Sequence, residues 1–237
     1  MDEMTGNHLV DLLSSDDQDA LVGRAHRVQL RQGAVLEEPG QGVRAVYFPV
    51  SGLLSIIADL PRGRDIEIGV IGYEGMTGSG LALGDDQAPF ATIVQSPGDA
   101  LVIERAEYLA VAEQRPRVAN LARLFARAFS IQIASTALAN GRAKLEDRLA
   151  RWLLMAQDRL DSDRVRMTHE FFAVMLGVRR AGVTEALHLL EGKHLIYSRR
   201  GEVIIRDREG LIDLADGSYG FPEQEYQRLL GAPDRGR

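Results

Sequence analysis

The hydrophobic pattern changes its period once along the chain, near Ile103, and this change is the strongest constraint on the fold. Before it, short runs such as "RAVYFPVSGLLSIIADL" and "DIEIGVIG" alternate or are rich in β-branched residues. Glycine and proline separate these runs at intervals of roughly 8 to 15 residues, which predicts an antiparallel β-roll rather than a parallel α/β sheet. In front of the runs, helical spacing at Leu9, Leu12 and Leu13 predicts short helices.

After Ile103 the period is that of helices, and the longest one begins at Pro116, a residue that the first helical turn tolerates. A narrow stripe of apolar or small residues, spaced by three and four, predicts a coiled-coil-like seam and a homodimer. The stripe contains Leu121, Leu124, Ala128, Ile131, Ser135 and Leu138. Packing on the chain's own β-roll is the alternative, and Phe125, Phe129 and Ile133 on the other side indicate that the helix does both. Asn140-Gly141 predicts a hinge.

The segment "MTHEFFAVMLGVRRAGVTEALHLLEGKHLI" predicts a helix-turn-helix. Thr168 can cap a first helix that ends near Leu176, and Gly177 can turn the chain. The second helix is expected from Arg179 or Arg180 to Glu191, with Gly192 as its stop. The following "LIYSRRGEVIIR" alternates around a turn and predicts a two-stranded hairpin, so the unit is a winged helix-turn-helix.

The second helix has one face for the core and one for a partner. Val183, Ala186, Leu187 and Leu190 repeat at helical spacing and form the core face. The opposite face and its flanks carry side chains that can contact bases and phosphates, because arginine binds guanine and the first turn of a recognition helix lies nearest the bases. The predicted DNA-binding residues are Thr168, Arg179, Arg180, Ala181, Thr184, Glu185 and His188, with Arg199 and Arg200 in the hairpin.

The charge distribution agrees with a double-stranded DNA partner for one part of the chain. The whole chain carries a formal charge of −6, but residues 142–210 carry 14 Lys+Arg against 11 Asp+Glu. A local excess of positive charge is expected where a domain meets a polyanion.

The order of β-roll, long helix and winged helix-turn-helix resembles the Crp/Fnr family of bacterial transcription regulators, over roughly residues 20–215. The resemblance is most specific in "LEDRLARWLL" and in the helix-turn-helix segment. It implies a homodimer, a palindromic operator and a small-molecule effector between the roll and the long helix, and it makes RNA polymerase a candidate partner. The family's DNA-reading positions fall on Arg179, Arg180, Ala181 and Glu185. The catabolite-activator branch has Glu and Arg where Ala181 and Glu185 stand, so its operator sequence does not transfer.

The expected effector pocket also departs from the family pattern. In "GYEGMTGSGLALGDDQAPFATIVQ", Ser79 stands near the position of the ribose-binding Glu, and Pro89-Phe90 stand at the phosphate-binding Arg-Ser pair. Without that charge, the resemblance predicts an effector other than cyclic AMP; the alternative is a cyclic-nucleotide-responsive module that retains a weak nucleotide site. The predicted pocket residues are Met76, Gly78, Ser79, Leu81, Pro89, Phe90, Thr92, Phe129, Gln132 and Thr136.

The expected fold class is therefore α+β, in three parts: a cyclic-nucleotide-binding-like effector domain at residues 1–115, a dimerisation helix and hinge at 116–141, and a winged helix-turn-helix domain with a tail at 142–237. The absence of cysteine excludes disulfides and cysteine-ligated clusters, and no histidine pair has metal-ligand spacing, so no cofactor or metal is expected. No run of about 18 apolar residues occurs and the N-terminus is acidic, which predicts a cytoplasmic protein that does not enter a membrane.

An enzyme is the competing class of function, because "GSGLALG" resembles a dinucleotide-binding glycine loop. It lies among predicted β-roll strands, is followed by no clear helix and has three residues before its last glycine instead of two. The chain is therefore expected not to be an enzyme. A regulatory module without DNA binding is a further alternative. The sequence does not specify the operator, the effector, or whether the output is activation or repression.

Overall fold

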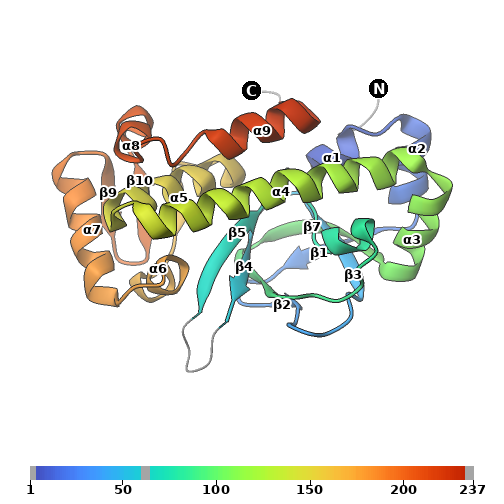
Figure 1. The fold of residues 1–237 in the computed structure, drawn as a ribbon, viewed down its shortest axis with the longest axis horizontal. Coiled ribbons are helices and arrows are strands. Elements are labelled where there is room, and N and C mark those ends of the chain that lie inside the picture. Colours follow the sequence, from blue (N-terminus) through green and yellow to red (C-terminus); the bar gives the residue numbers. More distant parts are fainter. Residues whose placement is uncertain (1–3, 60–64, 233–237) are drawn as a thin grey trace.

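The computed structural model describes residues 4–59 and 65–232. Its N-terminal half is a β-roll preceded by two short helices (Figure 1). Helices α1 (His8–Asp11) and α2 (Ser15–Val22) come first, as the leucine spacing predicts. The strands of the roll are β1 (His26–Leu30), β2 (Val35–Glu37), β3 (Ala45–Pro49), β4 (Leu53–Ala58), β5 (Ile66–Ile71), β6 (Ala91–Ser96) and β7 (Gly98–Glu104).

These strands form two antiparallel sheets, which confirms the predicted roll. One sheet has the order β1-β7-β3 and the other β2-β6-β4-β5. The glycine-rich loop folds into the 3₁₀ helix η1 (Ser79–Leu83), flanked by Gly78 and Gly84. Both glycines adopt left-handed φ angles of 64° and 86°, a conformation that other residues rarely adopt, so the glycines serve turns within the roll.

Helix α3 (Arg105–Gln114) leads into the long helix α4 (Pro116–Arg142). The helix runs through Asn140 and Gly141 to Arg142, and the break before the next helix comes at Ala143, two residues after the expected hinge. One glycine costs a helix interior about 1 kcal/mol, too little to end a helix of this length on its own.

The C-terminal half contains the predicted winged helix-turn-helix. Its elements are α5 (Leu145–Leu160), β8 (Arg164–Arg166), α6 (His169–Leu176), α7 (Arg180–Gly192), β9 (Ile196–Arg199) and β10 (Glu202–Ile205). Thr168 caps α6 and Gly177 turns the chain with a φ of 61°, as predicted. Helix α7 ends at Gly192, within one residue of the predicted end, and the left-handed residue that follows it is His194, with a φ of 61°. Strand β8, which joins the hairpin in the order β8-β10-β9, was not predicted, since its R-V-R alternation extends over only three residues.

The chain ends in α8 (Arg208–Leu214) and α9 (Phe221–Leu230), and α9 returns to the first half of the molecule. It lies along α4, while the sheets of the roll lie below α4 in the view of Figure 1. Tyr226 and Leu230 of α9 belong to the hydrophobic core of the roll. This region was predicted to be a tail, so its contact with the roll is a correction to that expectation.

The two halves share part of their cores. The core of the C-terminal half includes Leu53 and Ile57 of β4 and Val70 of β5, packed with Leu149, Trp152 and other residues of α5. The turn of the helix-turn-helix also packs closely on the roll at Gly177. A side chain there would not fit, because its Cβ would lie 2.9 Å from Ile66 Cδ1 of β5. The roll therefore contacts the C-terminal half directly, through β4 and β5. Within the residues described, no helix combines the length and apolar character that a membrane span requires.

Candidate DNA-binding surface and effector cavity

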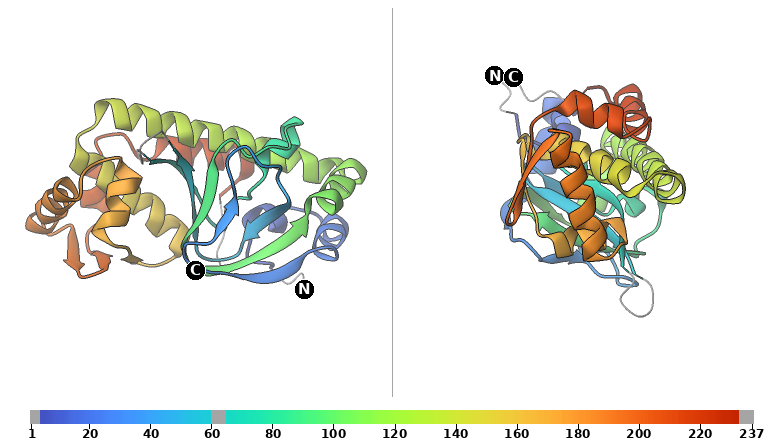
Figure 2. Two further views of the ribbon diagram at one scale, coloured as in Figure 1. Left: turned by 90° about the horizontal axis from the view of Figure 1, so that it is seen from below. Right: turned by 90° about the vertical axis from the view of Figure 1, so that its left-hand side faces the viewer.

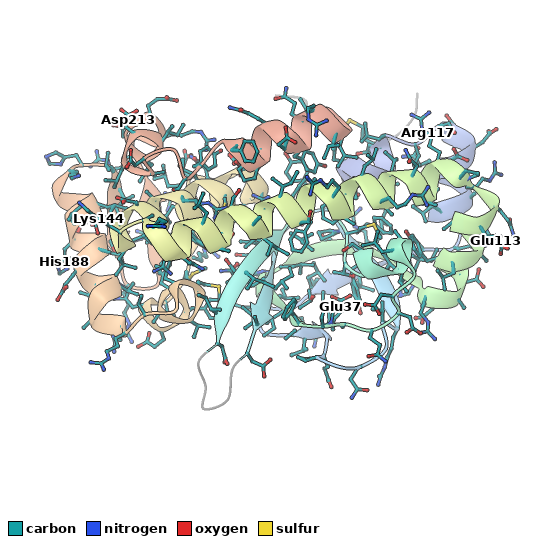
Figure 3. The ribbon with its side chains drawn as sticks, in the orientation of Figure 1. Glu37, Glu113, Arg117, Lys144, His188 and Asp213 are labelled. Carbon is teal, nitrogen blue, oxygen red and sulfur yellow. The ribbon has the colours of Figure 1, made fainter. Side chains whose placement is uncertain are left out.

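The first turn of α7 projects from the end of the molecule. Val183, Ala186, Leu187 and Leu190 are buried, so the face expected to pack on the core does so. Of the residues predicted on the other face, Arg179, Arg180, Ala181, Glu185 and His188 are exposed, and Thr184 is half-buried. Figure 3 shows His188 on the outer side of α7, and Figure 2 shows α7 at the end of the molecule facing the viewer, with the hairpin beside it. This helix end is accessible to a partner as large as a DNA duplex.

Local contacts hold some of these side chains in place. Arg180 Nη1 lies 3.0 Å from Glu170 Oε1, but both side chains are more than 60% exposed, so the pair is weak and easily exchanged for a phosphate or a base. Thr184 Oγ1 donates to the Arg180 carbonyl oxygen at 3.2 Å and lies 3.1 Å from His169 Nδ1, which links α7 to α6. Thr168 accepts a hydrogen bond from the Phe171 N–H at 3.2 Å. Its role at DNA remains a prediction.

Several arginines of the hairpin and the neighbouring strand β8 surround the buried carboxylate of Glu202. Arg199 Nε donates to Glu202 Oε2 at 2.5 Å, and the same carboxylate lies 3.6 Å from Arg164 and 3.9 Å from Arg166. Arg200 is exposed at the turn. Arg164 and Arg166 of β8 were not among the predicted residues, although the R-V-R pattern around the buried Val165 could have indicated a strand with both arginines on its open face. The hairpin sheet thus carries Arg164 and Arg166 in addition to the predicted Arg199 and Arg200.

A cavity of about 240 Å³ lies between the roll and α4, where the effector pocket was expected. The predicted residues that line it are Met76, Gly78, Ser79, Pro89, Phe90, Thr92 and Phe129. Leu81, Gln132 and Thr136 do not line it. Gln132 instead accepts from the Val70 N–H at 2.8 Å and donates to the Val70 carbonyl, and Thr136 lines a small separate cavity beside Glu67.

The charged residue types that line this cavity are acids. Glu37, which the sequence analysis missed, lies within the roll beneath α4 (Figure 3) and accepts hydrogen bonds from the Thr92 hydroxyl and from the Gly78 N–H, the latter at 2.9 Å. Burial raises the pKa of the Glu37 carboxyl. Asp85 also lines the cavity, and among the described residues no lysine or arginine does. A bound anion would therefore lose its hydration without gaining a cation.

The predicted seam on α4 is only partly open in the single chain. Leu138 is 67% exposed, and Leu121, Leu124 and Ser135 are partly exposed. Ala128 and Ile131 are 4% and 7% exposed, which corrects the expectation that the whole stripe faces a partner. The helical spacing could not reveal that α9 of the same chain packs against α4.

Two family models match the chain. A cyclic nucleotide-binding domain matches residues 27–115, and a Crp-like helix-turn-helix domain matches residues 147–214. Neither includes α9. No curated protein sequence is significantly similar to the chain.

Several solved structures have a similar fold. A putative Crp/Fnr regulator from Eubacterium rectale is 18% identical, with a TM-score of 0.68 over 86% of this chain and 96% of that one. FixK2 from Bradyrhizobium japonicum is 18% identical, with a TM-score of 0.69 over 80% and 96%. The regulator CLP from Xanthomonas campestris, described as responsive to c-di-GMP, is 17% identical, with a TM-score of 0.67 over 81% and 99%.

Proposed function

The chain belongs to the Crp/Fnr family of transcription regulators, and on this premise we propose that it binds a palindromic operator as a homodimer under the control of an effector other than cyclic AMP. DNA binding is supported mainly by the exposed first turn of α7, where Arg179 and Arg180 lie. The other face of this helix is buried against the core. Such a turn can enter the major groove and contact bases. The arginines of the hairpin sheet would contact phosphates. RNA polymerase is the partner expected for an activating output.

Replacing Arg180 with alanine should weaken binding to the preferred operator by about 1 to 3 kcal/mol, because a bidentate contact to guanine is lost. An operator selected from random duplexes and a scrambled duplex would be titrated in parallel by fluorescence anisotropy. Arg27→Ala, which removes an exposed cation from β1 of the roll, is the matched control and should bind as the wild type does. Unchanged operator affinity in Arg180→Ala would show that α7 is not the reading helix.

The dimer is proposed to form through the exposed part of α4. Leu138 and its neighbours Ala134 and Ala137 are exposed near the C-terminal end of the helix, where a second copy could cover them. Covering an apolar stripe of this kind is the usual driving force for pairing helices.

Leu138→Asp should convert the dimer to a monomer, because two aspartates would face each other across the proposed seam. Since Leu138 is 67% exposed in the single chain, the variant should still fold. Sedimentation equilibrium gives the mass, and Leu109→Asp on α3, at a side chain that is 41% exposed, is the control. A wild-type mass of 26.1 kDa, that of one chain, would exclude the dimer.

The effector is proposed to be neutral and largely apolar. A cyclic nucleotide would bring a phosphodiester next to Glu37 and Asp85, and the described lining of the cavity offers no cation to receive it. The remaining walls, with Met76, Phe90 and Phe129, suit an apolar ligand.

Calorimetric titration with cyclic AMP and cyclic GMP should therefore give no saturable heat at micromolar concentrations. The Glu37→Gln variant distinguishes the effect of the acid on ligand binding from the effect of the cavity's shape. It removes the buried acid and keeps the acceptor for the Gly78 N–H. A dissociation constant in the micromolar range for the wild type would favour the alternative of a retained nucleotide site.

A further inference from the structure

The small cavity beside Glu67 lies where the two halves of the molecule meet. Its walls come from β5 of the roll, the C-terminal end of α4, α5 and the end of α6. It has a volume of about 20 Å³, which exceeds the roughly 10 to 15 Å³ that one water molecule requires. A cavity of this size has room for one small ion but not for an organic ligand.

Two arginines of α5, Arg148 and Arg151, line this cavity one helical turn apart. Arg148 Nη2 donates to the Leu176 carbonyl oxygen, and Arg151 Nε donates to the Ser218 carbonyl oxygen at 2.8 Å. Each guanidinium has a further buried nitrogen, Arg148 Nε and Arg151 Nη2, that donates to no described residue. Arg151 is only 5% exposed. Because a buried cation is costly unless acceptors surround it, both groups favour an additional acceptor in the cavity.

The nearby carboxylates outside the cavity do not neutralise both arginines. Arg148 pairs with no described carboxylate, and burial lowers the pKa of its guanidinium. Burial also lowers the pKa of Arg151, and Glu223 of α9 opposes this shift without forming a salt bridge. Glu223 attracts Arg159 as well and raises its pKa. Two arginines therefore share the charge of Glu223, and Arg148 has no such partner among the described residues.

The other charges beside α5 form pairs of their own. Arg159 lies 2.7 Å from Glu74, and Arg208 lies 2.8 Å from Asp158. Each pair is neutral in itself, so these four residues add no net charge at the cavity.

Glu67 is the one acid among the described residues that line the cavity, and it attracts Arg151 when it is ionised. Its contacts favour a neutral carboxyl group. Ser55 Oγ lies 2.5 Å from Glu67 Oε2 and 2.7 Å from Gln95 Oε1, and one hydroxyl cannot donate to both unless Glu67 supplies a proton. With Glu67 protonated, the described lining carries two positive charges and no negative one.

We propose that this cavity binds a small inorganic monoanion of about the size of chloride, between Arg148 and Arg151. The ion would accept the hydrogen bonds that Arg148 Nε and Arg151 Nη2 do not donate within the chain, and charge-assisted bonds of this kind are strong. Arg148 also holds the Leu176 carbonyl, next to the turn at Gly177, so a bound ion would fix the helix-turn-helix against α4 and the roll. The proposal rests on neither DNA binding nor the dimer.

Bromide is a suitable probe, because it is close to chloride in size and quenches tryptophan fluorescence on contact. Trp152 is the only tryptophan of the chain, and it lines the cavity. Its side chain is 4% exposed, so bromide in bulk solvent should hardly quench it. Bromide is titrated into the full chain in gluconate buffer at constant ionic strength. The quenching should saturate in the millimolar range, and chloride should reverse it. Phosphate, which is too large for the cavity, should not.

Three variants make the result specific to the cavity. Arg148→Met should weaken bromide binding at least about tenfold, because the unpaired cation is lost. Arg142→Met removes an exposed cation at the end of α4 that does not line the cavity, and it should bind bromide as the wild type does. Thr136→Leu keeps both arginines and fills part of the cavity, so it should abolish the saturable quenching.

The pH dependence of binding tests the contribution of Glu67. The wild type should lose bromide affinity about three- to ten-fold between pH 5.5 and 8, because an ionised Glu67 repels the anion and attracts Arg151. Glu67→Gln should show no such loss. Equal pH profiles for the two chains would remove the net positive charge on which the proposal depends. It is also wrong if quenching stays linear up to about 0.3 M bromide, far above a millimolar dissociation constant, if Arg148→Met and Arg142→Met bind alike, or if phosphate displaces bromide.

Discussion

Replacing Arg159 with methionine should lower the free energy of unfolding by about 3 to 5 kcal/mol, because it leaves Glu74 buried without its cation. Arg159 Nε and Glu74 Oε1 are 2.7 Å apart, and both side chains are less than 10% exposed. The pair joins α5 of the DNA-binding half to the segment after β5 of the roll. Urea unfolding at pH 7 gives the free energy, and the slope of the transition shows whether the two halves still unfold together.

A double variant separates the unpaired charge from the loss of packing. Glu74→Gln combined with Arg159→Met leaves no buried charge and keeps an acceptor for the Gly72 N–H, which now donates to Glu74 Oε2 at 3.0 Å. This variant should recover at least about half of the loss, since a buried ion pair can often be replaced at little cost while a broken one cannot. If the free energy of unfolding of Arg159→Met alone lies within about 1 kcal/mol of the wild-type value, the prediction is wrong, and water must reach the Glu74 carboxylate.

The elements that the sequence predicted correctly are those whose signals are local. Thr168 as a cap, Gly177 as a turn and the spacing of Val183 and Leu187 all act within a few residues, and each lies where the pattern placed it. The Arg159–Glu74 pair and the contact of α9 with α4 join residues far apart in the chain. No periodicity within one segment carries information about such partners.

The difference between local and long-range signals also explains which lining residues of the candidate effector cavity were predicted correctly. The predicted lining from Met76 to Thr92 lies in one continuous stretch of the roll, and most of it lines one cavity. Gln132 and Thr136 do not, because the direction of a side chain on α4 depends on how the helix is rotated against the sheets. Glu37 was missed because it lies on a three-residue strand, too short for a pattern, and reaches the cavity only through the pairing of β2 with β6.

Glu67 is a second buried acid that connects the roll to the C-terminal half. Its contacts indicate that its carboxyl group is protonated. Trp152 Nε1 of α5 donates to Glu67 Oε1 at 2.6 Å. Ser55 Oγ lies 2.5 Å from Glu67 Oε2 and 2.7 Å from Gln95 Oε1, and one hydroxyl cannot donate to both. A protonated Glu67 donates to Ser55, which leaves the Ser55 hydroxyl free to donate to Gln95. Burial raises the pKa of Glu67 to about 7, in agreement with this arrangement.

Glu67→Gln should therefore remove a pH dependence of stability between about pH 4.5 and 7. The native chain holds this proton more tightly than the unfolded chain does, so the contribution of Glu67 to stability is complete below the lower limit and is lost as the pH rises to the upper one. The neutral amide is not subject to this loss. The variant should match the wild type at the acidic end and exceed it at pH 8 by on the order of 2 to 3 kcal/mol. Urea unfolding across this range measures the difference, with Glu113→Gln, at an exposed acid on α3, expected to follow the wild type. Parallel profiles for Glu67→Gln and the wild type would show that Glu67 is already ionised in the folded chain.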